Sequence, residues 1–183
     1  MANRDSLVLD ACVLLNLLAT RVMHEILPLA ARRVLVCDLV RDESFYLQSD
    51  DGSDEQVLID LQPLFDRGTI HLCSLENDLE NQAFVDLAAQ LDDGEAMSIA
   101  IALSRNMLIA TDDKKARRIF QENTTNRNAL LSTSDLVREW AEANELPIIE
   151  VKAVLTRIET IARYFPPNSD QNYVWWNEIM NPH

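Results

Sequence analysis

The sequence predicts an α/β protein with a central, mainly parallel sheet of four to five strands flanked by helices. Short apolar runs typical of buried strands alternate with longer helical segments over most of the chain. Strands joined through helices form right-handed crossovers, so their carboxyl ends are expected along one edge of the sheet. A length of 183 residues is enough for one domain with a sizeable core.

The individual elements follow from the spacing of apolar residues and from capping residues. Strands are expected at residues 6–9, 34–37, 69–73 and 107–110, with 130–131 as a fifth, short candidate. Helices are expected at residues 11–18, 22–32, 38–47, 55–65, 78–90, 93–105, 114–122, 135–145 and 148–163. Pro28 is expected to strain or shorten the second helix, and residues 48–55 are interpreted as an acidic surface turn.

The stretch 91–118, LDDGEAMSIAIALSRNMLIATDDKKARR, carries the strongest local signals. Asp92 or Asp93 supplies an N-cap, and Glu95 falls in the first turn, where the helix dipole favours a negative charge. The helix is apolar at so many positions that it is expected to be largely buried. Asn106 suits a left-handed residue at its carboxyl end.

Acidic residues stand directly after two of the predicted strands. The strand at 107–110 leads through Thr111 into Asp112 and Asp113, and the strand at 6–9 is followed at once by Asp10. Open α/β sheets place their chemistry at the carboxyl ends of such strands, which makes these carboxylates candidate metal ligands. For Asp10 the alternative is an N-cap of the next helix, and this segment alone leaves both roles open.

Two flanking helices add further carboxylates, Glu43 and Glu95. On the predicted helix 38–47, Glu43 shares a side with apolar positions; the alternative is a solvated side chain beside its charged neighbours. Four or five converging carboxylates would repel one another strongly unless a hard divalent cation neutralised them. Oxygen-only ligands fit Mg²⁺ or Mn²⁺ best.

The runs LVLDACVLLNLL and DDGEAMSIAIALSRNMLIATDDKKARR, with Glu43 between them, resemble a PIN domain. The resemblance covers roughly residues 7–120 and implies a three-layer metal-dependent nuclease fold, as in VapC-type toxins and related RNA-processing proteins. One departure is Ala11, which stands where many members carry Ser or Thr. The resemblance implies that the catalytic metal is held by Asp10, Glu43, Glu95 and one or both of Asp112 and Asp113.

The chemistry expected of these ligands is hydrolysis of a phosphodiester by a metal-activated water. Thr111 is expected to orient a ligand or the water through its hydroxyl. Lys114, Lys115 and Arg118 belong to the densest basic cluster of the chain, and we interpret them as phosphate contacts beside the acidic site. The alternative for this basic cluster is a solvated helix face.

The composition limits the kinds of binding partner and the cellular compartment that can be expected. The net charge of −14 argues against wrapping a long nucleic acid over a broad basic face, but permits contact with one phosphate. Three cysteines without zinc or disulfide spacing favour free thiols and a cytoplasmic location. No run approaches the roughly 20 apolar residues of a membrane span, so no membrane association is expected. His71 is expected to pack or hydrogen-bond, because no nucleophile pairs with it.

Two functions remain open at this level. The first is an endoribonuclease, either the toxin of a toxin–antitoxin pair or an RNA-processing enzyme; the second is a catalytically silent PIN-fold binding module. The complete acidic set favours the enzyme, whereas the net charge favours the module. Residues 1–165 are expected to form the nuclease domain, and residues 166–183 an aromatic tail that packs on it or on a partner. The expected partners are RNA, an antitoxin protein and a second copy of the chain in a homo-oligomer.

Overall fold

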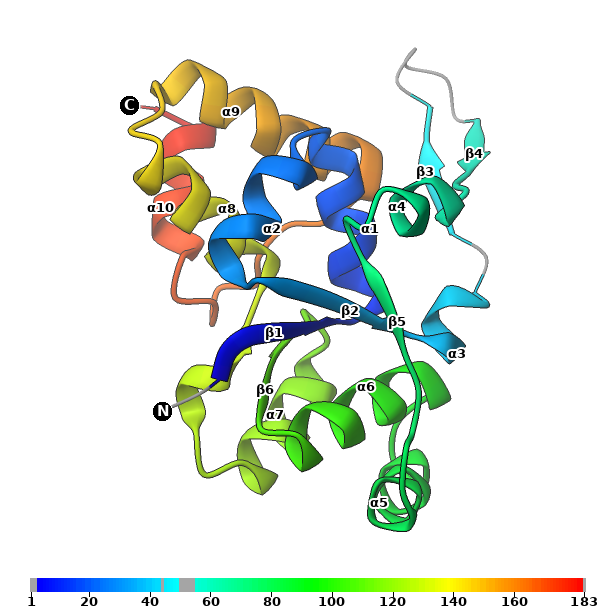
Figure 1. Ribbon diagram of the computed structural model, residues 1–183. Helices are drawn as coiled ribbons and strands as arrows, with labels where there is room; N and C mark the ends of the chain where they lie inside the picture. The colour runs from blue at the N-terminus through cyan, green and yellow to red at the C-terminus, as the bar shows by residue number, and fades with distance from the viewer. Residues whose placement is uncertain (1–2, 44, 50–54, 183) are drawn as a thin grey trace.

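The computed structural model describes residues 3–43, 45–49 and 55–182 and shows a sheet between two layers of helices (Figure 1). The strands of this sheet lie in the order β5-β2-β1-β6-β7, and every neighbouring pair is parallel. They are β1 (Asn3–Leu9), β2 (Arg33–Cys37), β5 (His71–Cys73), β6 (Met107–Ala110) and β7 (Leu130–Leu131). The predicted α/β class and three-layer architecture are confirmed.

Helices cover both faces of the sheet (Figure 1). One face carries α5 (Asp78–Ala88), α6 (Asp93–Ser104) and α7 (Lys114–Asn123). The other face carries α1 (Ala11–Thr20), α2 (Met23–Ala30), α8 (Thr133–Ala143), α9 (Ile148–Arg157) with its π-helical continuation η2 (Ile158–Ala162), and α10 (Tyr173–Met180). Because α6 lies between the sheet and α5, it is buried nearly all round, and Ile99 and Ile101 expose at most 1% of their surface.

The order in which the strands are added to the sheet reverses at β1. From β1 the chain proceeds outward to β2 and β5, then returns to the other side of β1 to form β6 and β7. In open parallel sheets such a reversal creates a crevice at the carboxyl ends of the two central strands. Leu9 pairs with Ala110, and the N–H of Asp10 donates to the carbonyl of Ala110 at 3.0 Å. The residues that follow β1 and β6 therefore lie side by side.

The predicted helix at 38–47 is wrong beyond its first turn. The helix α3 covers only Asp38–Arg41, and β3 (Tyr46–Gln48) then pairs antiparallel with β4 (Gln56–Leu58) in a separate two-stranded sheet. Phe45 and Leu47 are buried while Tyr46 between them is 48% exposed. This alternation is the two-residue period of a strand, which packs the apolar side chains inward where a helix would not.

The predicted helix at 55–65 is also wrong in its first half. Residues 56–58 form β4, and the N–H of Ile59 donates to the carbonyl of Phe45 at 2.8 Å, which prolongs the hairpin. A helix begins only at α4 (Gln62–Asp66), where Pro63 occupies the first turn and needs no N–H. The centre of the predicted acidic turn, residues 50–54, lies outside the described residues.

The C-terminal segment packs against α9 of the same chain. Trp176 on α10 is fully buried, its ring meets that of Tyr164 edge to face at 6.0 Å, and its indole N–H donates to Glu159 at 2.7 Å. The division of the chain at residue 165 stays a prediction. Among the described residues, no helix combines the length and apolar character that a membrane crossing requires.

Candidate functional site

Asp10 lies at the carboxyl end of β1 with only 3% of its surface exposed. One carboxylate oxygen accepts the N–H of Ala11 at 2.8 Å, and the other accepts the hydroxyl of Thr111 at 2.7 Å and the thiol of Cys12 at 3.2 Å. Burial raises the pKa of Asp10, and the nearby charge of Asp92 raises it further, while the hydrogen bonds oppose this. Asp10 therefore caps α1 and also presents a carboxylate at the crevice.

The first turn of α6 brings further carboxylates to this edge. Asp92 caps the helix, as the sequence predicts for Asp92 or Asp93, by accepting the N–H of Glu95 at 3.0 Å. Burial of the half-buried Glu95 raises its pKa to about 7, together with the negative charges of Asp92, Asp113 and Asp10. Glu95 therefore interacts electrostatically with the carboxylates of Asp10 and Asp113, which follow β1 and β6.

Glu43 reaches the same cluster from the turn that follows α3. A Cβ placed on Gly94 would stand 2.5 Å from Oε1 of Glu43, so the glycine leaves the space in which this carboxylate lies. Burial raises the pKa of Glu43, and Asp92 and Asp10 raise it further. Glu43 therefore lies near the other acids, although the long helix expected to carry it does not form.

Asp112 is held by hydrogen bonds on both carboxylate oxygens. Oδ1 accepts the N–H of Thr133 at 2.9 Å and the hydroxyl of Tyr164 at 3.1 Å. Oδ2 accepts the hydroxyl of Thr133 at 2.5 Å and the amide of Asn16 at 2.9 Å. Burial raises the pKa of Asp112, and these four bonds counter the shift. Asp112 therefore ties β6 to α1, to α8 and to the segment that precedes α10.

Asp113 has a different environment from that of its neighbour. It is the N-cap of α7, where its Oδ1 accepts the N–H groups of Lys115 and Ala116, both at 2.8 Å. Among the described residues, its Oδ2 makes no hydrogen bond, and its charge contributes to the raised pKa of Glu95. Of the two adjacent acids, Asp113 keeps an oxygen available for a ligand, and Asp112 does not.

Thr111 connects the two central strand ends. Its hydroxyl donates to Asp10 at 2.7 Å and accepts the N–H of Asp113 at 3.2 Å. The predicted role, orientation of a ligand through the hydroxyl, is compatible with this geometry and stays a prediction.

The predicted phosphate contacts are divided between two places. Lys114 and Arg118 line a groove of about 680 Å³ between α7 and the segment 164–171, and Asp112 also lines it. Arg118 also pairs with Glu122 at 3.0 Å, one helical turn along α7. Both side chains are exposed, so both are available to a ligand in the groove.

Lys115 points elsewhere, because its ammonium donates to the carbonyl of Gln90 at the end of the α5 segment. A fourth basic residue of this helix, Arg117, donates to the carbonyls of Thr111 at 2.7 Å and Leu131 at 2.9 Å. Arg117 therefore fixes the strand ends of β6 and β7. The assignment of Lys115 to substrate binding stays a prediction.

Several residues that shape the site are not among those predicted from the sequence. Asp92 is predicted only as a cap, yet its charge acts on Asp10, Glu43 and Glu95. The donor Asn16 is 4% exposed within the apolar run of α1, and a lone amide in such a helix is a signal that it satisfies a buried acceptor. No comparable local signal marks the other partners of Asp112, which come from far along the chain.

The acidic residues of the site are chemically suited to a divalent cation, because they offer only oxygen donors. Such an ion would also relieve the repulsion between their negative charges. Within the described parts of the chain, no three Asp, Glu, His or Cys side chains stand close enough to form a ready metal site. The carboxylates would therefore have to draw together on binding a cation.

The parallel sheet carries carboxylates at the carboxyl ends of its two central strands, where the strand order reverses. This arrangement is typical of α/β proteins whose functional site lies beyond the strand ends. The family model DUF3368, described as a PIN domain, matches residues 6–126. This match covers nearly two thirds of the chain, which therefore belongs to the PIN-domain family, as the sequence motifs predict. PIN domains are generally nucleases and typically use divalent metals. No curated protein and no solved structure matches the chain significantly.

Proposed function

We propose that this protein is an endoribonuclease that uses Mg²⁺ or Mn²⁺ to hydrolyse RNA phosphodiester bonds. The observation that carries the proposal is the electrostatic cluster of Asp10, Glu43, Glu95 and Asp113 at the carboxyl ends of β1 and β6. Oxygen-only donors suit Mg²⁺ or Mn²⁺ better than softer metals. Membership of a family of nucleases supports phosphodiester hydrolysis as the reaction.

Each residue of the cluster has a proposed role. Asp10, Glu95 and Asp113 would hold the cation, with Glu43 beside Gly94 completing the set. When bound, a divalent cation supplies an activated water and offsets charge on the phosphate. One of these carboxylates would also accept a proton from that water.

The substrate would enter along the groove between α7 and the segment 164–171. Lys114 and Arg118 line this groove and would contact phosphates on one side of the scissile bond. Asp112, which the sequence offers as an alternative metal ligand, is proposed instead to hold β6, α1 and α8 in register through its four hydrogen bonds.

The test is cleavage of a mixed set of single-stranded and structured RNAs with Mg²⁺ or Mn²⁺, with EDTA as a control. Asp10→Asn should reduce cleavage by more than the roughly 10–100-fold typical of outer-shell changes at metal sites. Its free energy of unfolding should change by no more than about 1 kcal/mol, because asparagine still accepts the N–H of Ala11 and no longer buries a charge.

The matched control is Asp86→Asn, which removes an exposed carboxylate on α5 that, within the described part of the chain, accepts only the amide of Gln82. It should leave cleavage unchanged. Cleavage that survives Asp10→Asn would show that the site is misassigned or that the activity is a contaminant. Loss of folding in Asp10→Asn would show that the cap of α1 is the residue's main role.

A catalytically silent binding module is the second candidate. The observation that favours it is the spacing of the carboxylates, since no three of them within the described residues are already close enough to hold a metal. Metal binding by calorimetry without cleavage of any RNA would support this module. If cleavage is found, growth arrest on expression that disappears in Asp10→Asn would distinguish a toxin, with an antitoxin as partner, from an RNA-processing enzyme.

A further inference from the structure

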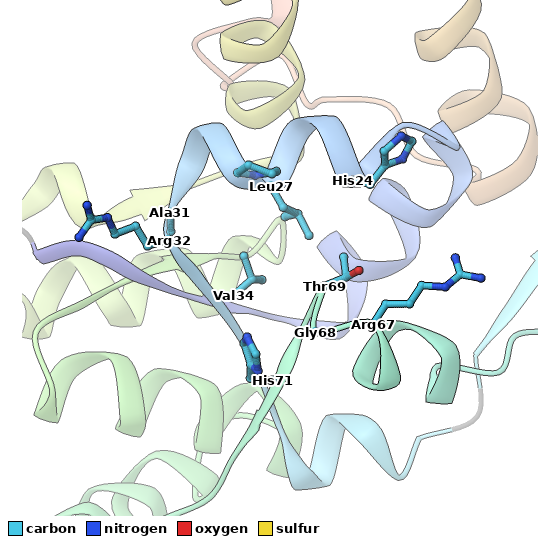
Figure 2. Close-up of a pocket in the computed structure, with 10 residues that line it drawn as sticks. His24, Leu27, Ala31, Arg32, Val34, Arg67, Gly68, Thr69 and His71 are labelled. Carbon is cyan, nitrogen blue, oxygen red and sulfur yellow. The ribbon is translucent and has the colours of Figure 1, made fainter.

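A separate pocket of about 330 Å³ opens at the other end of the sheet (Figure 2). Its walls are one side of α2 with the start of β2, and the segment that leads from α4 into β5. Val34 at the start of β2 lines it, whereas Cys37 ends β2 at the carboxyl edge, roughly 10 Å further along the strand at 3.3 Å per residue. The pocket is therefore distinct from the carboxylate cluster.

The ionisable side chains that line this pocket are all basic. They are His24, Arg32, Arg67 and His71, and no carboxylate is among the lining residues. This is unusual in a chain with 30 acidic and 16 basic residues. Among the described residues, neither Arg32 nor Arg67 has an ion pair or a side-chain hydrogen bond. Figure 2 shows Arg67 on the same side of the pocket as His24, with Arg32 on the opposite side.

The floor of the pocket is apolar. It is formed by Leu27, Ala31 and Val34, which expose 2%, 6% and 4% of their surfaces. The hydroxyl of Thr69 lies between the two walls (Figure 2), and it makes no hydrogen bond within the described chain. An apolar floor with one polar group and a basic rim suits a small ligand that has a flat apolar body and an anionic end.

A purely structural explanation covers part of this arrangement. Arg32 and Arg67 follow the ends of α2 and α4, where a cation offsets the negative end of a helix dipole. This explanation does not extend to His71, which lies on β5, or to His24 near the start of α2. It also does not account for the finding that, among the described residues, the ionisable groups lining this apolar floor are all basic, although the carboxylate of Glu25, outside the lining, lies 3.7 Å from the ring of His24.

We propose that this pocket binds a nucleoside monophosphate. The phosphate would be held by Arg67, on the same side as His24 (Figure 2), because guanidinium groups form paired, charge-assisted hydrogen bonds with phosphate oxygens. The base would lie on the apolar floor beside His71, and a ribose hydroxyl would bond with Thr69. The volume is near the lower end of the range for small-molecule sites, which suits one nucleotide rather than a strand. This proposal does not rest on the proposed nuclease function.

The test is titration of the full chain with adenosine 5′-monophosphate in the presence of EDTA. Calorimetry measures the affinity, and changes in the amide chemical shifts locate the site. We expect one saturable site, with shifts at Thr69 and His71 rather than at Asp113. Arg67→Ala should weaken binding by about tenfold or more, the effect of losing one charge-assisted hydrogen bond. Arg41→Ala, which removes an exposed arginine outside the pocket, should leave binding unchanged.

Three results would overturn the proposal. The first is no saturation at millimolar nucleotide, and the second is unchanged binding in Arg67→Ala. The third is inorganic phosphate binding as tightly as the nucleotide, which would leave no role for the apolar floor. Adenosine without phosphate should bind at least about tenfold more weakly than the nucleotide. Thermal unfolding of each variant shows whether an arginine acts only by stabilising a helix end.

Discussion

The different roles of the adjacent acids Asp112 and Asp113 can be separated by replacing each with alanine. Asp112→Ala removes the acceptor for the N–H and the hydroxyl of Thr133 and for the hydroxyl of Tyr164, while the amide of Asn16 still donates to the hydroxyl oxygen of Thr133 at 3.1 Å. A buried donor left without a partner costs about 1–3 kcal/mol. Three donors lose this acceptor, and the two on Thr133 are fully buried; less the relief of a buried charge, they predict a loss of about 3 kcal/mol.

Asp113→Ala should cost much less stability. It removes an N-cap that accepts two backbone N–H groups at 2.8 Å, a loss typically worth about 1 kcal/mol. It should nevertheless abolish tight Mn²⁺ binding, because Asp113 is the proposed ligand. The folded fraction of Asp112→Ala should still bind Mn²⁺.

Urea denaturation gives the free energies of unfolding, and calorimetry under native conditions gives the Mn²⁺ affinities. The reasoning is refuted if Asp112→Ala is as stable as the unmodified protein and has lost Mn²⁺ binding, since Asp112 would then be the ligand. Asp113→Asn is a further check, because asparagine caps helices as well as aspartate does and should change the free energy of unfolding by only about 0.5 kcal/mol.

Two further predictions concern pH and have opposite signs. The pKa of Glu95 is raised from 4.5 to about 7, so the free energy of unfolding of the metal-free protein should fall as pH rises through this interval. Urea denaturation at a series of pH values measures this. A free energy that does not change with pH, or a pH dependence that is the same in Glu95→Gln, would contradict the prediction. The pKa of Glu80 is lowered from 4.5 to about 2 by Arg105, so its contribution is present above pH 4.5 and lost as pH falls towards 2. Glu80→Gln should cost about 3 kcal/mol at pH 7, and the exposed control Glu142→Gln no more than about 1; equal losses would contradict the buried ion pair.

The parts of the fold that could be predicted from sequence depend on short-range signals. Asp92 caps α6, and Asn106 has a positive φ of 51°, as expected after the last turn. The apolar runs form β1, β2, β5, β6 and β7 close to their predicted bounds. Because parallel strands must align at one edge, the placement of Asp10 near Asp113 follows from these local signals and a general rule of topology.

The hairpin β3–β4 could not be predicted, because its stability comes from pairing rather than from local preference. Residues 38–47 contain positions that suit a helix, but Phe45 and Leu47 gain burial only when the chain extends and meets β4. The partner strand β4 follows residues 50–54, which lie outside the described residues. It has no strong strand pattern of its own, since all its residues are exposed.

The sequence by itself determined the class of fold, the strand ends that carry the acids and the family to which the chain belongs. Only the tertiary structure shows that hydrogen bonds occupy both carboxylate oxygens of Asp112, because their donors lie 21, 52 and 96 residues away along the chain. It also decided that Arg67 and His24 line one pocket. Hydrogen-bond partners and charged neighbours of this kind are set by packing between distant elements, and no local pattern records them.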